Sequence, residues 1–262
     1  MRSYTRHQLK EDKFAKAVSD QMHWTVEHRN TVIIAAIVLV AVLVGGYFAW
    51  DQMRKRDDQA SVALGKAMRV YTAPLTVAGQ AVAPGTTTFG STKERSAAAQ
   101  KEFQKVADEF PSTKNGKYAL YLAGVSALDG GDSKKSEEIL SKVAGDGDKD
   151  ISTLAKFALA SLYVSQNKDA DAVKMYKDVI QADARTVPKT TAQLELAAYY
   201  ETKNPAEAVK IYEDIQKTEE ANRKANAPKE SKDAKKPATP EVKTPLEEMA
   251  AAKIQQLKQT AR

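Results

Sequence analysis

The side chains that most often carry catalysis are sparse in this sequence of 262 residues. All three histidines, His7, His23 and His28, lie within the first 30 residues, ahead of a long apolar run. No histidine-based catalyst can therefore be assembled from the rest of the chain. The chain has no cysteine, which excludes a disulfide framework and a thiolate metal site and leaves the redox compartment open.

Three other patterns resemble sites of chemistry but lack the context that such sites need. Residues 165–168 (SQNK) match an active-serine spacing, but they lie at a predicted turn between helices and lack the companion motifs. Gly65-Lys66 lacks both the earlier glycine and the following Ser or Thr of a phosphate-binding loop. Residues 146–150 (DGDKD) indicate a solvated turn rather than a metal cage. We therefore expect no enzyme activity, no cofactor, no metal and no small-molecule substrate.

One apolar segment decides the class of the protein. Residues 30–50 contain no charged side chain, and residues 32–50 would span roughly 28 Å as a helix. A buried core helix is seldom apolar on every face at this length, and a cleaved signal peptide does not fit a run that 30 residues precede. We predict a single transmembrane helix at 31–50, with Trp24, Tyr47 and Trp50 at the membrane interface.

The orientation of this helix does not follow from charge alone. Residues 11–29 carry three basic side chains and residues 51–70 carry five, which mildly favours a cytoplasmic C-terminus. The segment 1–30 is short, and both an interfacial helix and a solvated coil fit it.

The remainder of the chain is repetitive. The small residues Ala99, Ser136, Ala172 and Ala208 are separated by 37, 36 and 36 positions. Each is followed four residues later by a large side chain and three residues after that by a branched one. These followers are Phe103 and Val106, Leu140 and Val143, Tyr176 and Val179, and Tyr212 and Ile215. The spacing places all three on one helical face, where the small residue lets a second helix approach closely.

Turn signals at 130–132, 167–169 and 203–205 separate these helices from a second amphipathic stretch that precedes each of them. The sequence therefore predicts an all-α fold, a stack of helix pairs over residues 51–216 that follows the transmembrane helix.

These residues resemble the tetratricopeptide repeat. Gly124 and Ala160 fall at the small position of its first helix, Ala99, Ala172 and Ala208 at that of its second, and Pro111 at its closing proline. Leu196 and Ser136 depart from the motif. The first repeat is split, with its front helix within 54–72 and an insert at 73–92, which we expect to be an extended loop or a small hairpin. Both a partner contact and a mobile bulge fit this insert.

The resemblance to tetratricopeptide domains implies a concave groove lined by the front helix of each pair. The implied groove residues are Tyr118, Tyr121, Val125, Leu128, Leu154, Phe157, Ser161, Val164, Thr190, Gln193, Ala197 and Tyr200. Gln193 is the one basic or amide side chain among them, so binding of an acidic peptide tail is not expected. The aromatic character suits extended apolar or unfolded segments. Packing between repeats is an equally good account of any single member.

The C-terminal part divides into two predicted segments. Residues 217–245 hold eight basic residues, five acidic residues, four prolines and no aromatic residue, so we expect a disordered linker. Residues 246–262 form an amphipathic helix that either caps the last repeat or binds a partner on its own.

The net charge of +6 is spread too thinly to indicate a nucleic-acid partner. A short N-terminal segment, one uncleaved span and downstream repeats resemble the YfgM-type family, the ancillary subunit of the bacterial SecYEG translocon. The resemblance implies an inner-membrane protein with a cytoplasmic N-terminus, periplasmic repeats, and translocon subunits, periplasmic chaperones or unfolded clients as partners. A scaffold for cell division or outer-membrane assembly is the alternative. A cytoplasmic adaptor follows only if the charge count sets the orientation.

Overall fold

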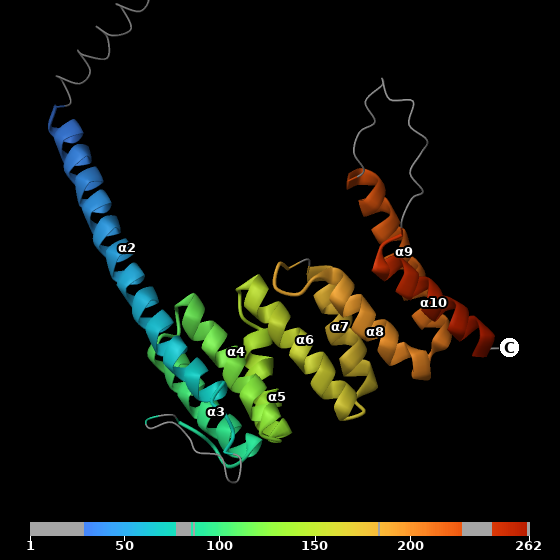
Figure 1. Cartoon of the computed structure of the whole chain (residues 1–262). Helices are drawn as coiled ribbons and strands as arrows, with labels where there is room; N and C mark the ends of the chain where they lie inside the picture. The colour runs from blue at the N-terminus through green and yellow to red at the C-terminus, as the bar shows by residue number, and fades with distance from the viewer. Residues whose placement is uncertain (1–28, 77–84, 86, 183, 227–242, 261–262) are drawn as a thin grey trace, which may run out of the picture. The chain divides into compact units, whose positions relative to one another are not determined.

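The structure is a computed structural model, which describes residues 29–76, 85, 87–182, 184–226 and 243–260. These residues form a series of α-helices. The chain forms two units, residues 1–58 and 59–262. The described helices are α2 (Arg29–Tyr71), α3 (Thr92–Glu109), α4 (Lys114–Asp129), α5 (Ser133–Ala144), α6 (Lys149–Ser165), α7 (Asp169–Ala182), α8 (Lys189–Lys203), α9 (Pro205–Asn226) and α10 (Pro245–Thr260) (Figure 1).

In the first unit, the described part of α2 exposes its apolar side chains. The large apolar residues from Ile33 to Met53 are all exposed. One helix of the described chain, Ile37–Tyr71, is long and apolar enough to cross a membrane. Eight charged residues follow Trp50 before the helix ends, so its apolar part is the N-terminal one. This helix continues from the predicted span into the predicted first repeat without a break. Trp24 and the three histidines lie outside the described residues.

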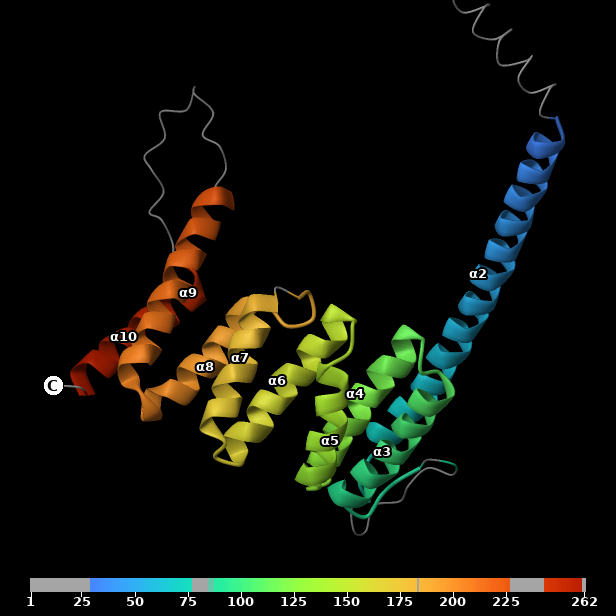
Figure 2. The same cartoon turned by 180° about the vertical axis from the view of Figure 1, so that it is seen from behind.

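In the second unit, consecutive helices from α3 to α10 pack against one another in chain order (Figure 1, Figure 2). The end of α2 packs with α3 through Ala60 and Ala67, which lie in one apolar cluster with Phe103. The pairs are therefore α2 with α3, through this cluster, and α4 with α5, α6 with α7, and α8 with α9, and α10 packs on α9. This arrangement confirms the predicted all-α repeat fold.

The repeated side chains form the core of the stack. All twelve residues of the small, large and branched triplets are buried. Gly124 shows why the small positions matter, because a Cβ atom there would lie 2.7 Å from Leu140 Cδ2. Ala160 fills the equivalent position in α6 and is fully buried. Close approach of helices at these points lets each pair cover the apolar face of the next.

Local signals set the helix ends. Ser91, Thr113, Asp132 and Asp148 each accept a hydrogen bond from a backbone amide in the first turn of α3, α4, α5 and α6, respectively. Such caps satisfy amide groups that have no partner within the helix. Asn167, with φ 57°, closes the turn between α6 and α7 in a conformation that asparagine tolerates better than most residues.

The expectation of disorder over 217–245 is wrong for its first ten residues, because α9 continues to Asn226. The first of the four prolines in this range is Pro228, and proline is disfavoured inside a helix. Residues 217–226 consist largely of good helix formers, and Lys224 pairs with Glu220 one turn earlier at 2.6 Å. Residues 227–242 lie outside the described residues.

The described ends of the predicted insert are tied together. Leu75 and Phe89 form an isolated parallel bridge, in which the amide of Thr76 donates to the carbonyl of Phe89 at 2.8 Å. Arg95 of α3 donates to the carbonyl of Ala73 at 3.2 Å. The insert therefore leaves and rejoins the stack at one place, and Thr92 already belongs to α3.

Candidate protein-binding surfaces

The predicted groove residues lie on the front helices α4, α6 and α8, but most of them are only partly accessible. Tyr118 is exposed, with 37% of its surface accessible. The other seven residues of the apolar row are half-buried; they are Tyr121, Val125, Leu128, Leu154, Phe157, Val164 and Tyr200. We refer to these eight residues as the front-helix row.

The first part of the row is an aromatic group. The rings of Tyr118 and Tyr121 stack with centroids 5.7 Å apart and planes inclined by 27°. Tyr71, at the end of α2, lies beside them and donates a hydrogen bond to Asp129 at 2.9 Å. Burial, followed by the hydrogen bond to Asp129, raises the pKa of Tyr71, and burial likewise raises the pKa of Tyr121. The rings of Tyr71 and Tyr121 are thus neutral at neutral pH.

The remainder of the row joins repeats together. Val125 and Leu128 pack against the buried cluster that α4 shares with α5 and α6. Phe157 meets the ring of Tyr176 edge to face at 5.9 Å. Val164 and Tyr200 pack against a second buried cluster, which contains Tyr176. These side chains therefore contribute to packing and present only their outer faces to a ligand.

Two residues that the repeat resemblance placed in the groove are not available there. Gln193 is 5% accessible and donates its amide to Asp214 of α9 at 2.7 Å. Ala197 is fully buried beside α9 and α10. Gln193 is turned toward α9, and Ala197 is covered by the apolar side chains that α9 and α10 contribute.

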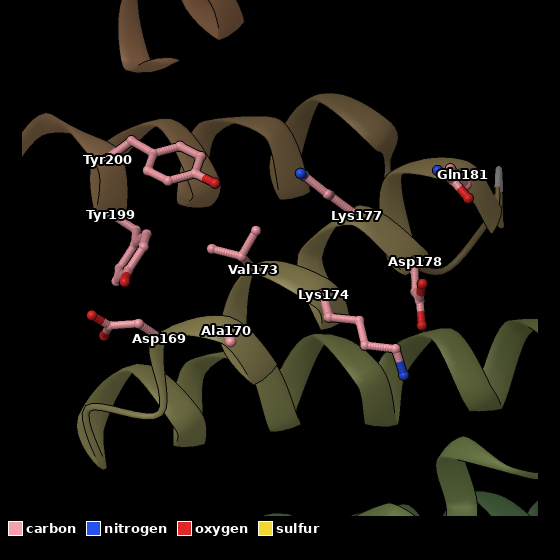
Figure 3. Close-up of a pocket in the computed structure, with 9 residues that line it drawn as sticks. All are labelled: Asp169, Ala170, Val173, Lys174, Lys177, Asp178, Gln181, Tyr199 and Tyr200. Atoms are coloured by element: carbon pink, nitrogen blue, oxygen red, sulfur yellow. The ribbon is translucent and has the colours of Figure 1, made fainter. Parts of the chain in front are cut away.

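A groove of about 630 Å³ lies between the outer face of α7 and the end of α8. Figure 3 shows the rings of Tyr199 and Tyr200 and the acidic side chain of Asp169 on one side of the groove, with Val173 and Ala170 of α7 beside them. The other lining residues, all on α7, are Lys174, Lys177, Asp178 and Gln181. We refer to this site as the α7–α8 groove.

The charges around this groove are not all free. Asp169 binds the ammonium of Lys203 at 3.0 Å and also holds the hydroxyl of Tyr199. Burial and this hydrogen bond raise the pKa of Tyr199 to about 12, and the ammonium of Lys203 lowers the pKa of Asp169. Within the described part of the chain, neither Lys174 nor Lys177 forms an ion pair.

Sequence reasoning did not find Tyr199 or the α7 face. One signal was present: Tyr163 and Tyr199 are 36 residues apart and are followed by Lys168 and Lys203. In the structure each of these tyrosine–lysine pairs contacts one carboxylate near the start of the preceding rear helix. Lys168 binds Glu137 at 2.9 Å, as Lys203 binds Asp169.

Two carboxylates of the acidic run at 146–150 already bind other groups of the protein. Asp146 accepts from Lys117 and from the amide of Asp148, each at 2.7 Å. Asp150 pairs with Arg185 at 3.2 Å. Among the described residues, no group of three or more acidic or histidine side chains is arranged to hold a metal ion.

The serine of the SQNK pattern also has a structural partner. Ser165 donates its hydroxyl to the carbonyl of Leu162 at 2.7 Å, at the last turn of α6. The hydroxyl thus bonds to the backbone of its own helix, as serine side chains in helices often do.

Comparison with known proteins gives one family and one fold relative. A sequence profile described as a tetratricopeptide repeat-like domain matches residues 22–187. No curated protein sequence matches the chain. The crystal structure of nearly identical TPR-like repeats from a Podosopora anserina protein described as a kinesin light chain is similar, with a TM-score of 0.49 and 14% identity. That similarity covers 78% of this chain and 86% of the other.

Proposed function

The chain belongs to the tetratricopeptide repeat-like domain family, and we propose that it is a non-enzymatic protein-protein interaction module anchored in a membrane by α2. Stacked helix pairs present extended surfaces on which other polypeptides bind. The observation that carries this proposal is the continuity of α2. Its exposed apolar part runs directly into the first helix of the stack, so one element joins a membrane anchor to a binding domain.

The family match supports this reading, because it begins at residue 22 and includes the apolar helix together with the first three helix pairs. The proposed anchor therefore lies within the region that the family profile matches, and not outside it.

We further infer that the anchor lies in a bacterial inner membrane, with a cytoplasmic N-terminus and periplasmic repeats, and that the domain acts beside the SecYEG translocon on emerging proteins. The architectural similarity to the YfgM-type family supports this inference. The partly exposed aromatic rings of the front-helix row suit such clients, since rigid rings supply contact area at a low cost in side-chain entropy.

A pair of reporter fusions tests the orientation. An enzyme that is active only in the periplasm is fused to the C-terminus of the full chain, and a reporter that is active only in the cytoplasm is fused in parallel. We expect activity from the first fusion and none from the second. The reverse result would overturn the translocon role and leave a membrane-tethered cytoplasmic adaptor.

A cross-linking experiment tests the partner. A photoreactive residue at Leu43, which is exposed in the apolar part of α2, should form an adduct with a translocon subunit. The same residue at Lys105 of α3 is the control, because it lies outside the apolar helix. Adducts with a component of the division or outer-membrane assembly machinery instead would favour the scaffold role.

A further inference from the structure

We propose that the α7–α8 groove binds a segment of a partner protein in which an apolar or aromatic side chain lies next to a carboxylate. The inference rests on the proposed function as a protein-binding module and names the chemistry of one bound segment. It concerns a surface distinct from the front-helix row, because of the eight row residues only Tyr200 lines the groove.

The apolar half of the groove fits one large side chain. Val173 and Ala170 line the groove beside two rings in mutual contact, Tyr199 and Tyr200, whose centroids are 5.5 Å apart. The volume of about 630 Å³ falls within the range of ligand sites in proteins. Tyr199 is held in place by its hydrogen bond to Asp169, so the groove has a preformed aromatic wall.

The charged half of the groove favours a carboxylate over a cation. Asp169 is already satisfied by Lys203 and Tyr199, and its charge is offset by the ammonium at 3.0 Å. Lys177 points toward the Tyr200 side of the groove, whereas Asp178 points to the opposite side (Figure 3). An ammonium group on the Tyr200 side of the groove (Figure 3) can therefore bind a carboxylate adjacent to a bound apolar side chain.

The position of the groove also suits a polypeptide better than a compact ligand. It follows the exposed side of α7 from Asp169 to Gln181, which is more than three turns of helix. An extended segment can lie along this face with its apolar side chain at the tyrosines and its carboxylate at Lys177.

The test uses the full chain in lipid nanodiscs and a fluorescein-labelled peptide with the centre Phe-Leu-Asp-Glu between Gly-Ser flanks. Two matched peptides replace either the acids with Asn and Gln or the apolar pair with two serines. We expect measurable binding of the first peptide and binding about tenfold weaker for each of the others, by fluorescence anisotropy. Absence of binding for all three peptides would overturn the proposal.

A charge swap distinguishes direct contact from a structural effect. Lys177→Glu should weaken binding of the acidic peptide about tenfold and should bind a Phe-Leu-Lys-Lys peptide better than the wild-type chain does. Lys105→Glu, an exposed lysine on α3 outside the groove, should leave both affinities unchanged. Equal behaviour of the two variants would refute the role of Lys177.

The same preparations separate this inference from the proposed function. Binding of a permanently unfolded protein to the front-helix row should be the same in Lys177→Glu and in the wild-type chain. If the wild-type chain binds the acidic peptide but no unfolded protein, the chaperone-like function fails and the groove proposal stands.

Discussion

The ammonium of Lys203, at the end of α8, lies 3.0 Å from the carboxylate of Asp169, at the start of α7. The same relationship occurs one repeat earlier, where Lys168 binds Glu137 at 2.9 Å. In both cases the turn after a front helix is tied to the rear helix of the preceding pair. The two ion pairs therefore link repeats rather than residues within one repeat.

These ion pairs predict a loss of stability in acid. Hydrogen bonds from the lysine ammonium groups hold the pKa of Asp169 below its usual value of 3.8 and that of Glu137 below 4.5. A carboxyl whose pKa is lower in the folded state stabilises the fold above its unfolded pKa, and this contribution is lost as the pH falls through the folded value. Circular dichroism between about pH 6 and pH 2 should show unfolding on the acid side. The Asp169→Asn variant should show a weaker dependence of stability on pH than the wild-type chain, and an identical dependence would contradict the assignment.

Tyr199 predicts the opposite behaviour at high pH. Burial and the hydrogen bond to Asp169 raise its pKa to about 12. A tyrosine whose pKa is higher in the folded state stabilises the fold at pH values below its unfolded pKa, near 10, and this contribution disappears as the pH rises toward 12. Ultraviolet titration of tyrosinate should lose one late-titrating group in Tyr199→Phe. In Asp169→Asn that group should titrate earlier, and an unchanged titration curve would count against the contact.

Substitution of Gly124 by alanine should create a packing defect, and the same substitution at Gly65 is its control. In Gly124→Ala the new Cβ would lie 2.7 Å from Leu140 Cδ2 and 2.8 Å from Leu140 Cγ, and Leu140 is fully buried. We expect the free energy of unfolding to fall by about 1–3 kcal/mol. Gly65→Ala, in α2 with no atom within 4 Å of its Cβ, should instead stabilise the helix by up to about 1 kcal/mol. Urea denaturation of both variants measures the difference, and equal effects would refute the close approach.

The core of this fold could be predicted from the sequence more completely than its surfaces. A period of 36 or 37 residues places a small, a large and a branched side chain on one face of each rear helix. This pattern was sufficient to predict that the face is buried, as the structure shows. The orientation of the front-helix row was less predictable. Whether Gln193 points to solvent or to Asp214, 21 residues away, depends on how α9 crosses α8. The α7–α8 groove depends on the same kind of crossing, which spacing along one chain does not specify.

The front-helix row contains one residue that should affect binding more than it affects the fold. Tyr118 is the most accessible residue of the row, so Tyr118→Ala should weaken binding of a permanently unfolded protein about threefold to tenfold and lower the melting temperature less than Phe157→Ala does. Phe157, which packs on Tyr176, is the contrasting position. Phe157→Ala should lower the free energy of unfolding by about 3 kcal/mol. Anisotropy and thermal denaturation measure the two effects, and unaltered binding by Tyr118→Ala would remove that residue from the surface.

The end of the stack depends on Glu247, a buried acidic side chain in the first turn of α10. Its carboxylate is 3% accessible and accepts from Arg223 of α9 at 3.3 Å and from the amide of Thr244 at 2.6 Å. Thr244 returns the contact by accepting from the amide of Glu247 at 3.1 Å, which completes a reciprocal cap at the start of α10. Glu247→Ala should therefore lower the free energy of unfolding by about 2 kcal/mol and speed hydrogen exchange throughout α10. Glu248→Ala, its exposed neighbour in the same helical turn, should change exchange little, because it keeps both the cap and the link to α9. If Glu247→Ala leaves exchange in α10 unchanged, the helix is held by its apolar face through Ala250 and Leu257 rather than by this polar contact.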